Sequence, residues 1–223
     1  DSAVSRGLGD VYKRQQVRCW DTIIYNHLLK KNIIIPPRED HDKDTQYEGA
    51  YVKDPQLGLH NWIVSFDLNS LYPHLIMQYN LSPETLVGVQ PKNMGVENYL
   101  NEKFNLQWAK DKNVTVAPNG SMYRRDKQGF LPELMEKMYG DRVVFKKKTI
   151  EAKKEFQKTK DPIYKNEISR CNNIQMAKKI ALNSAYGAIG NQYFRYFDVR
   201  IAEAITLGLS LIHISEPTRH CTI

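Results

Sequence analysis

The spacing of apolar residues predicts a helix early in the chain and a buried strand further on. In WDTIIYNHLLKK (Trp20–Lys31), apolar residues recur every three or four positions, which is the period of a helix with one buried face. That face carries Trp20, Ile23, Ile24, His27 and Leu28. The run IIIPP that follows predicts an extended exit, because a proline restricts the residue before it. WIVSF (62–66) is β-prone and ends at Asp67, and a turn with a short helix is expected directly afterwards in SLYPHLI.

The second half of the chain favours two longer helices, from about Pro132 to Lys158 and from about Tyr164 to Asn191. The polar run KTKDP (158–162) interrupts the helical pattern between them. Two long helices joined by a short polar turn form a helical hairpin. Residues 80–130 hold short apolar runs separated by turn signals, which predicts short strands and turns.

The two ends of the chain differ from its middle. Residues 1–15 (DSAVSRGLGDVYKRQ) and 208–223 (ending LSLIHISEPTRHCTI) lack a clear amphipathic period. Both resemble peptides produced when sequencing-adapter DNA is translated, and the alternative is that they are disordered tails. We therefore base every functional prediction on residues 16–207.

Charge is concentrated in the predicted hairpin. The chain has a net charge of +7, and residues 131–179 hold 13 Lys or Arg against 7 Asp or Glu, a net +6. A polyanion such as nucleic acid is an expected partner for this region, although a solvated helical face is often lysine-rich as well.

The remaining composition points to a reduced, soluble, cytoplasmic protein. Hydrophobic residues make up 41% of the chain and charged residues 26%, which is ordinary for a globular domain. No apolar run approaches the roughly 18 residues that span a membrane, so no membrane association is expected. Cys19, Cys171 and Cys221 lie far apart without a CxxC motif, and we expect neither a zinc site nor a disulfide.

Three groups of residues could carry chemistry. Asp67 ends the predicted strand just before a sharp turn, where a carboxylate is well placed to hold a divalent cation, although it could instead cap the next helix. Lys179, Asn183 and Tyr186 fall on one face of the second long helix, and Gly187 follows them where a close approach to the backbone is expected. An ordinary helix end is the alternative there.

The third group is Arg142 with Lys146, four residues apart on the first long helix. A guanidinium fork and an ammonium group could together bind a triphosphate. Alone, the pair could equally be a solvated surface.

Together these segments resemble the B family of replicative DNA polymerases. DLNSLYP (67–73) is similar to the palm signature D-x-x-S-L-Y-P, and KIALNSAYG (179–187) is similar to the fingers signature K-x-x-x-N-S-x-Y-G. YEGA (47–50) fits the segment that precedes the palm signature in this family, and WDTIIYNHL, LSPET, PNGSMY and NQYFRYFDVR resemble its T-even bacteriophage branch. The resemblance covers residues 16–207.

The resemblance implies a role for each group. Asp67 and Lys179 would be the catalytic residues, and Asp67 with the carbonyl of Leu68 would bind Mg²⁺, of which the full enzyme uses two ions. The nucleotide-binding set would be Leu68, Ser70, Leu71, Tyr72, Arg142, Lys146, Lys179 and Asn183. The set in contact with DNA would be Tyr47, Gly49, Tyr186 and Gly187.

The resemblance also implies an α+β fragment of a polymerase right hand. Residues 16–130 would be the first part of the palm with its linker from the exonuclease side, 131–191 the fingers hairpin, and 192–207 the return to the palm. Primer–template DNA and dNTP are the implied ligands, with a sliding clamp and a single-stranded-DNA-binding protein as partners of the full-length enzyme. The family's D-T-D-S signature, with its second metal-binding aspartate, does not occur here, so we expect this piece alone not to polymerise.

Two alternatives remain open from the sequence. A non-catalytic module of polymerase descent would bind nucleic acid only, but it would not need the complete palm and fingers signatures. A protein-primed polymerase of the same family usually carries inserts between the two signatures, whereas only about 105 residues separate Tyr72 from Lys179 here.

Overall fold

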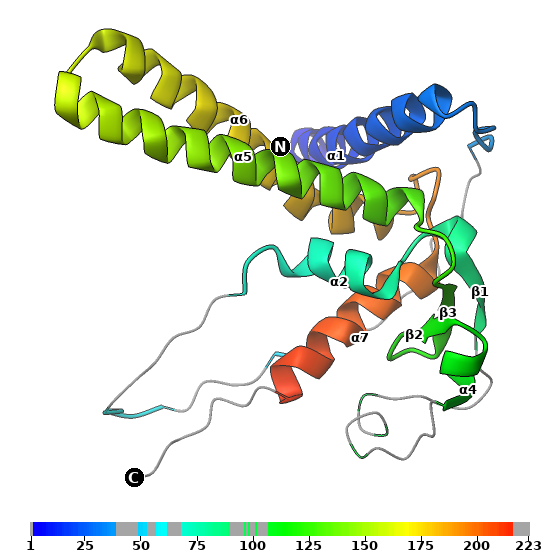
Figure 1. Ribbon diagram of the computed structural model, residues 1–223. Coiled ribbons are helices and arrows are strands. Elements are labelled where there is room, and N and C mark those ends of the chain that lie inside the picture. The colour runs from blue at the N-terminus through cyan, green and yellow to red at the C-terminus, as the bar shows by residue number, and fades with distance from the viewer. Residues whose placement is uncertain are drawn as a thin grey trace.

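The computed structural model describes residues 2–38, 49–52, 57–61, 68–89 and 107–215, with the single residues 96, 98 and 101. Long helices combine with one three-stranded antiparallel sheet, in agreement with the predicted α+β class (Figure 1). The predicted strand WIVSF, Asp67 and Tyr47 lie outside the described residues.

The first helix, α1, spans Ser2–Lys30 and buries the predicted face. Trp20, Ile24 and Leu28 are each at most 3% exposed. The helix begins far earlier than the amphipathic period predicts, because each further residue of an anchored helix adds a backbone hydrogen bond. A disordered tail is therefore wrong for the segment from Ser2 to residue 15, whereas its adapter origin stays a prediction.

The second helix, α2, spans Leu71–Tyr79 and is the short helix expected in the SLYPHLI segment, and it begins within the palm-like signature. Two residues in the left-handed conformation bound it, Ser70 (φ 54°, ψ 47°) before it and Asn80 (φ 57°, ψ 44°) after it. Leu75 and Ile76 are buried, so one side of this helix faces the core.

A small sheet follows α2, as expected for residues 80–130. After a 3₁₀ turn at Pro83–Thr85 (η1), the strands are β1 (Leu86–Val89), β2 (Val114–Val116) and β3 (Ser121–Arg124), in the spatial order β1-β3-β2 with both pairs antiparallel. A short helix, α4 (Gln107–Asp111), precedes β2 and has no counterpart in the sequence-based predictions.

The predicted helical hairpin is confirmed. Its helices are α5 (Phe130–Thr159) and α6 (Pro162–Ile189), which pack along one another (Figure 1). Between them, Lys160 adopts the left-handed conformation that ends α5, and Asp161 caps α6 by accepting a 2.9 Å hydrogen bond from the Ile163 N–H.

The last helix, α7 (Val199–Ser215), extends into the segment from residue 208, for which an adapter-derived peptide or a disordered tail was expected. The helix argues against the disordered alternative as far as Ser215, and the adapter origin stays a prediction. Leu209 and Ser210 are no more than 5% exposed, and a Cβ at Gly208 would touch the side chain of Leu75 at 3.4 Å. A helix buried on several sides is apolar nearly all round, so it shows no amphipathic period. The missing period therefore marks burial here, and residues 216–223 lie outside the described part of the chain.

The main core forms where α1, α2, α7 and the adjoining ends of α5 and α6 meet. Its largest fully buried side chains include Trp20, Ile24, Ile76, Leu131, Met135, Leu182, Ile189, Phe194, Ile201 and Ile205. The far half of the hairpin extends beyond this core (Figure 1), and its buried side chains there are the small ones of Thr149, Ala152 and Cys171. Within the described residues, no helix is both long and apolar enough to cross a membrane.

Candidate active site

The turn that leads into α2 presents backbone donors. Leu68 is 49% exposed, and the left-handed conformation of Ser70 turns the chain into the helix. The first intrahelical hydrogen bond runs from the His74 N–H to the Ser70 carbonyl, at 3.2 Å. The amides of Leu71 and Tyr72 precede it and therefore have no acceptor within the helix. Such a helix start suits an anion, because the N–H groups and the helix dipole both favour negative charge.

The structure brings Arg142 to this turn. Its Nη1 donates a 3.1 Å hydrogen bond to the Ser70 hydroxyl, which joins α5 to the start of α2. One turn earlier on α5, the ring of Tyr139 packs edge-on against His74, with centroids 4.8 Å apart. The buried Nε of Arg142 has no hydrogen-bond partner among the residues that the structure describes. A guanidinium with donor capacity left over thus lies beside the amides of a helix start.

The two signature segments also meet through their tyrosines. The rings of Tyr72 on α2 and Tyr186 on α6 stack with centroids 4.8 Å apart and an interplanar angle of 14°. This stack fixes the orientation of Tyr72 at the start of α2. Through this stack the carboxyl-terminal part of α6 contacts the start of α2, which Arg142 also contacts.

The other predicted cations lie along the hairpin from this point. Lys179 and Asn183 are exposed on the face of α6 that also carries Tyr186, about two turns and one turn away at roughly 1.5 Å per residue. Lys146 is exposed one turn beyond Arg142 on α5. Lys146 and Lys179 thus lie one turn and about two turns along the hairpin from Arg142 and Tyr186, the two residues that contact the start of α2.

The two glycines predicted to contact DNA differ in their surroundings. Gly49 is exposed, and a Cβ there would meet no atom within 4 Å. A Cβ at Gly187 would lie 3.3 Å from Oε1 of Gln16, so the close neighbour of this glycine in the structure is α1. Neither observation tests a contact with DNA.

Some residues that hold the site together escaped the sequence-based predictions. Trp20 was assigned only to a buried face, but its Nε1 donates to the Ala181 carbonyl (3.1 Å) and the Ser184 hydroxyl (3.2 Å), within the fingers-like signature. Lys178 binds Asp141 across the hairpin at 2.8 Å. Neither partner could be identified from sequence, because each pair joins segments far apart in the chain.

A metal ion would find only part of a site in the described residues. They contain no group of three His, Cys, Asp or Glu side chains able to hold a metal. The half-exposed Leu68 directly follows Asp67, so a carbonyl and a carboxylate are adjacent in the chain at this turn. Hard oxygen donors of this kind suit Mg²⁺.

Comparison with known proteins finds similarity to DNA polymerases. The family model for DNA polymerase family B matches residues 9–213. The DNA-directed DNA polymerase of Enterobacteria phage T4 is 31% identical over 86% of this chain and 25% of its own length, and that of Escherichia phage RB69 is 29% identical over 85% and 25%. DNA polymerase 1 of Pyrococcus abyssi is 34% identical over 91% of this chain and 23% of its own.

A solved structure is also similar to the structure of this chain. The family B DNA polymerase of Pyrobaculum calidifontis aligns with a TM-score of 0.58 and 25% identity, over 86% of this chain and 22% of that one. The chain spans about a quarter of the length of the curated relatives that it matches.

Proposed function

The chain belongs to DNA polymerase family B, and from this premise we propose that it supplies the palm and fingers segments that bind the incoming nucleotide in a DNA-directed DNA polymerase. T-even phage enzymes are among its relatives, as the signatures predict. The observation that carries the proposal is the hydrogen bond between Arg142 and Ser70, which places a guanidinium at a helix start whose first amides have no acceptor within the helix. The guanidinium on α5 and the backbone amides at the start of α2 therefore favour the same anion, although they come from two separate segments.

In the proposed reaction the primer 3′-hydroxyl attacks the α-phosphate of a dNTP, a new P–O bond forms, and pyrophosphate leaves. The amides of Ser70, Leu71 and Tyr72 would cradle the triphosphate as an anion nest. Arg142 and Lys146 would neutralise the β- and γ-phosphates, which lowers the energy of the charge that develops on the leaving group.

The face of α6 would complete the nucleotide site. Lys179 would bind the triphosphate as a catalytic cation, and Asn183 and Tyr186 would line the nascent base pair. Asp67 and the Leu68 carbonyl would hold Mg²⁺, which supplies charge neutralisation at the phosphates when bound. Tyr47, Gly49 and Gly187 would lie along the DNA backbone.

Tyr72 would select the sugar. Its stack on Tyr186 holds the ring in one orientation, so the ring can occupy the volume that a ribose 2′-hydroxyl needs. We expect the chain to prefer dATP over ATP, and Tyr72→Ala to reduce that preference.

Nucleotide titration of the chain tests the proposal. In magnesium buffer, dATP should bind more tightly than dAMP by calorimetry, because the cations and the helix start act on the phosphates. Arg142→Ala should weaken dATP binding about tenfold or more, since a hydrogen bond to a charged group contributes about 1.5–3 kcal/mol. Arg142→Lys should restore only part of the loss, because an ammonium lacks the guanidinium fork.

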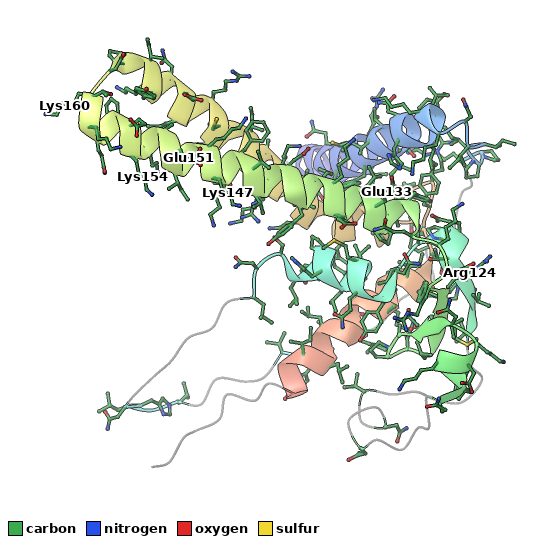
Figure 2. All side chains as sticks on the ribbon, in the orientation of Figure 1. Arg124, Glu133, Lys147, Glu151, Lys154 and Lys160 are labelled. Carbon is green, nitrogen blue, oxygen red and sulfur yellow. The ribbon has the colours of Figure 1, made fainter. Side chains whose placement is uncertain are left out.

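The matched control is Lys154→Ala, which removes an exposed cation from the far half of the same helix (Figure 2). It should leave dATP binding within about twofold, because charges separated by more than about 10 Å are screened at 0.1 M salt. Equal affinity for dATP and dAMP, or an Arg142→Ala variant that binds dATP like the parent chain, would contradict the proposal.

The positive charge of the hairpin favours one alternative, a module that binds nucleic acid without binding nucleotide. Such a module would bind primer–template DNA with a steep salt dependence but would not distinguish dATP from dAMP. The same titrations therefore separate the two functions.

A further inference from the structure

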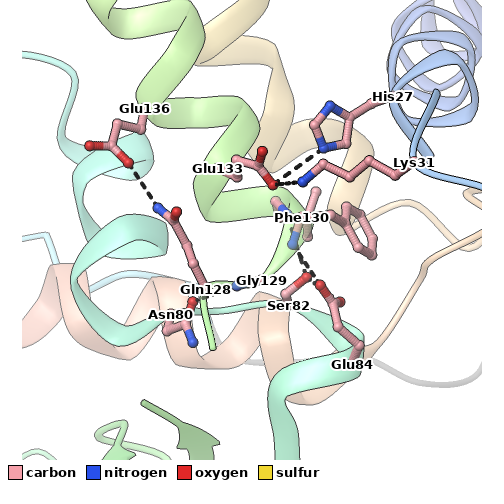
Figure 3. A network of polar contacts seen from close by, with 11 residues as sticks. His27, Lys31, Asn80, Ser82, Glu84, Gln128, Gly129, Phe130, Glu133 and Glu136 are labelled. Atoms are coloured by element: carbon pink, nitrogen blue, oxygen red, sulfur yellow. Dashed lines mark hydrogen bonds and ion pairs between the residues drawn. The ribbon is translucent and has the colours of Figure 1, made fainter. Parts of the chain in front are cut away.

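We propose that Asn80 and Glu84, at the far end of α2 from the nucleotide site, are positioning residues that set the angle of α5 and thereby place Arg142 on Ser70. The nucleotide part of this inference rests on the function proposed above. Its structural part depends only on how the first turn of α5 is held (Figure 3).

Glu84 caps α5 from outside the helix. Its Oε1 accepts a 2.6 Å hydrogen bond from the Phe130 N–H, and its Oε2 accepts one from the Ser82 hydroxyl. The cap residue of α5 is Gly129, which has no side chain to cap the helix itself. A carboxylate at a helix start also interacts favourably with the helix dipole. The first turn of α5 is therefore satisfied by a residue from η1.

Asn80 holds the chain that enters α5. Its Nδ2 donates to the carbonyls of Arg124 (2.6 Å) and Lys127 (2.9 Å), and its Oδ1 accepts from the Gly129 N–H (2.9 Å). One side chain thus makes three bonds to the backbone between β3 and α5. Asn80 also ends α2 in the left-handed conformation, which asparagine tolerates better than most residues.

The entry to α5 at Gly129 lies very close to the η1 segment and its cap residue Ser82. A Cβ at Gly129 would lie 2.5 Å from the Cβ of Ser82 and 3.1 Å from Cγ2 of Thr85. Thr85 in turn donates to the carbonyls of Asn80 (2.6 Å) and Ser82 (2.9 Å), which holds the η1 segment in shape. The base of α5 therefore has little room to tilt against this segment.

The consequence reaches the nucleotide site because α2 and α5 run antiparallel and α5 is bonded to the residues at both ends of α2. The Asn80–Gly129 bond joins one end, and the Ser70–Arg142 bond joins the other. Arg142 lies 12 residues beyond Phe130, about 18 Å along the helix at 1.5 Å per residue. A tilt of about 10° at the base would move Arg142 by about 3 Å over that length, enough to break its bond to Ser70.

A second tether acts on the same turn from another direction. Glu133, on the first turn of α5, binds Lys31 and lies 3.4 Å from Nε2 of His27, both at the end of α1 (Figure 3). It holds the first turn of α5 to the end of α1, whereas Asn80 and Glu84 hold the same turn to the segment that follows α2.

The geometric test measures the angle of α5 without any nucleotide. Spin labels at Gln78→Cys on α2 and Lys153→Cys on α5, both exposed positions, report one distance by double electron–electron resonance. Cys19→Ser and Cys221→Ser remove two other thiols. The parent chain should give a single narrow distance distribution, and Glu84→Ala should broaden or shift it.

Two further variants keep this test decisive if Glu84→Ala folds poorly. Glu84→Gln retains an oxygen that can accept from Phe130 and should keep the narrow distribution. Glu136→Ala removes another carboxylate near the base of α5, one that binds Gln128 at 2.8 Å, and should also leave the distribution unchanged. A Glu84→Ala distribution as narrow as the parent's, at the same distance, would overturn the positioning role.

The functional test is a double-mutant cycle on dATP affinity. Glu84→Ala should weaken dATP binding about fivefold to tenfold in the parent chain, up to about 1.4 kcal/mol. It should cause almost no further loss in the Arg142→Ala background, because it acts through Arg142. A role limited to general stability would lower both backgrounds equally, and that result would overturn the inference.

The two proposals fail in different ways. If the parent chain binds dATP no better than dAMP, the nucleotide function fails, and the distance measurement still decides whether Glu84 orients α5. If the parent chain binds dATP but Glu84→Ala changes neither distance nor affinity, only the positioning role fails.

Discussion

A methyl group added at Gly129 should separate the base of the hairpin from the segment that caps it. The backbone of Gly129 (φ −72°, ψ 159°) is open to any residue, so Gly129→Ala introduces no conformational strain. The new Cβ would lie 2.5 Å from the Cβ of Ser82, and Ser82 is fully buried. Because that atom is not the end of a flexible side chain, the helix or the η1 segment must move.

The expected loss of stability follows from overpacking, which typically costs about 1–3 kcal/mol. Alanine also restricts the unfolded chain more than glycine does, which stabilises by about 0.4–1 kcal/mol and offsets part of the loss. Gly140→Ala, also on α5, is the matched control, since a Cβ at Gly140 would meet no atom within 4 Å. That variant should gain about 0.5–1 kcal/mol, the usual preference for alanine within a helix.

Urea unfolding followed by circular dichroism measures both variants. Gly129→Ala should have the lower midpoint and Gly140→Ala the higher one, with a similar slope. Ser82→Gly combined with Gly129→Ala should lose less stability than the two single variants added together, because it removes the atom in conflict. A Gly129→Ala variant at least as stable as the parent chain would refute the close approach between Gly129 and Ser82.

Three further predictions follow from the contacts of α1, α2 and α6. The hydrogen bond from Lys31 lowers the pKa of Glu133 below its ordinary value of 4.5, so its stabilisation is present above pH 4.5 and disappears as pH falls through the lowered pKa. Glu133→Gln should therefore be less stable than the parent by roughly 1 kcal/mol or less at pH 7, and the difference should vanish in acid, as urea unfolding at several pH values would show. Trp20→Phe removes the one indole N–H that two partly buried hydrogen bonds to α6 share, and should lower the unfolding free energy by about 1–3 kcal/mol in the same assay, with an unchanged midpoint counting against these bonds. A double-mutant cycle with Tyr72→Leu and Tyr186→Leu should give a coupling of about 0.5–1.5 kcal/mol, and a coupling near zero would contradict the stack.

The sequence by itself determined the elements whose signals are local. The polar run around Asp161 separates α5 from α6, because an aspartate cap and a following proline act within a few residues of the helix start. The buried face of α1 from Trp20 to Leu28 follows from apolar spacing alone. The palm and fingers signatures also identified the family before any geometry was known.

The tertiary structure decided what depends on partners distant in the chain. The end of α7 is buried against partners distant in the chain, as Leu209 and Ser210 show, and residues 208–223 carried no clear local period that marked a helix there. Glu84 and Asn80 bond to the start of α5 more than 40 residues away, and no local pattern marks such a pairing. The sequence offered Arg142 as one member of a basic pair that could bind a triphosphate, but only the packing of α5 against α2 brings it to Ser70. Local signals specify elements because backbone preferences act over one turn, whereas a site forms only after packing has brought its elements together.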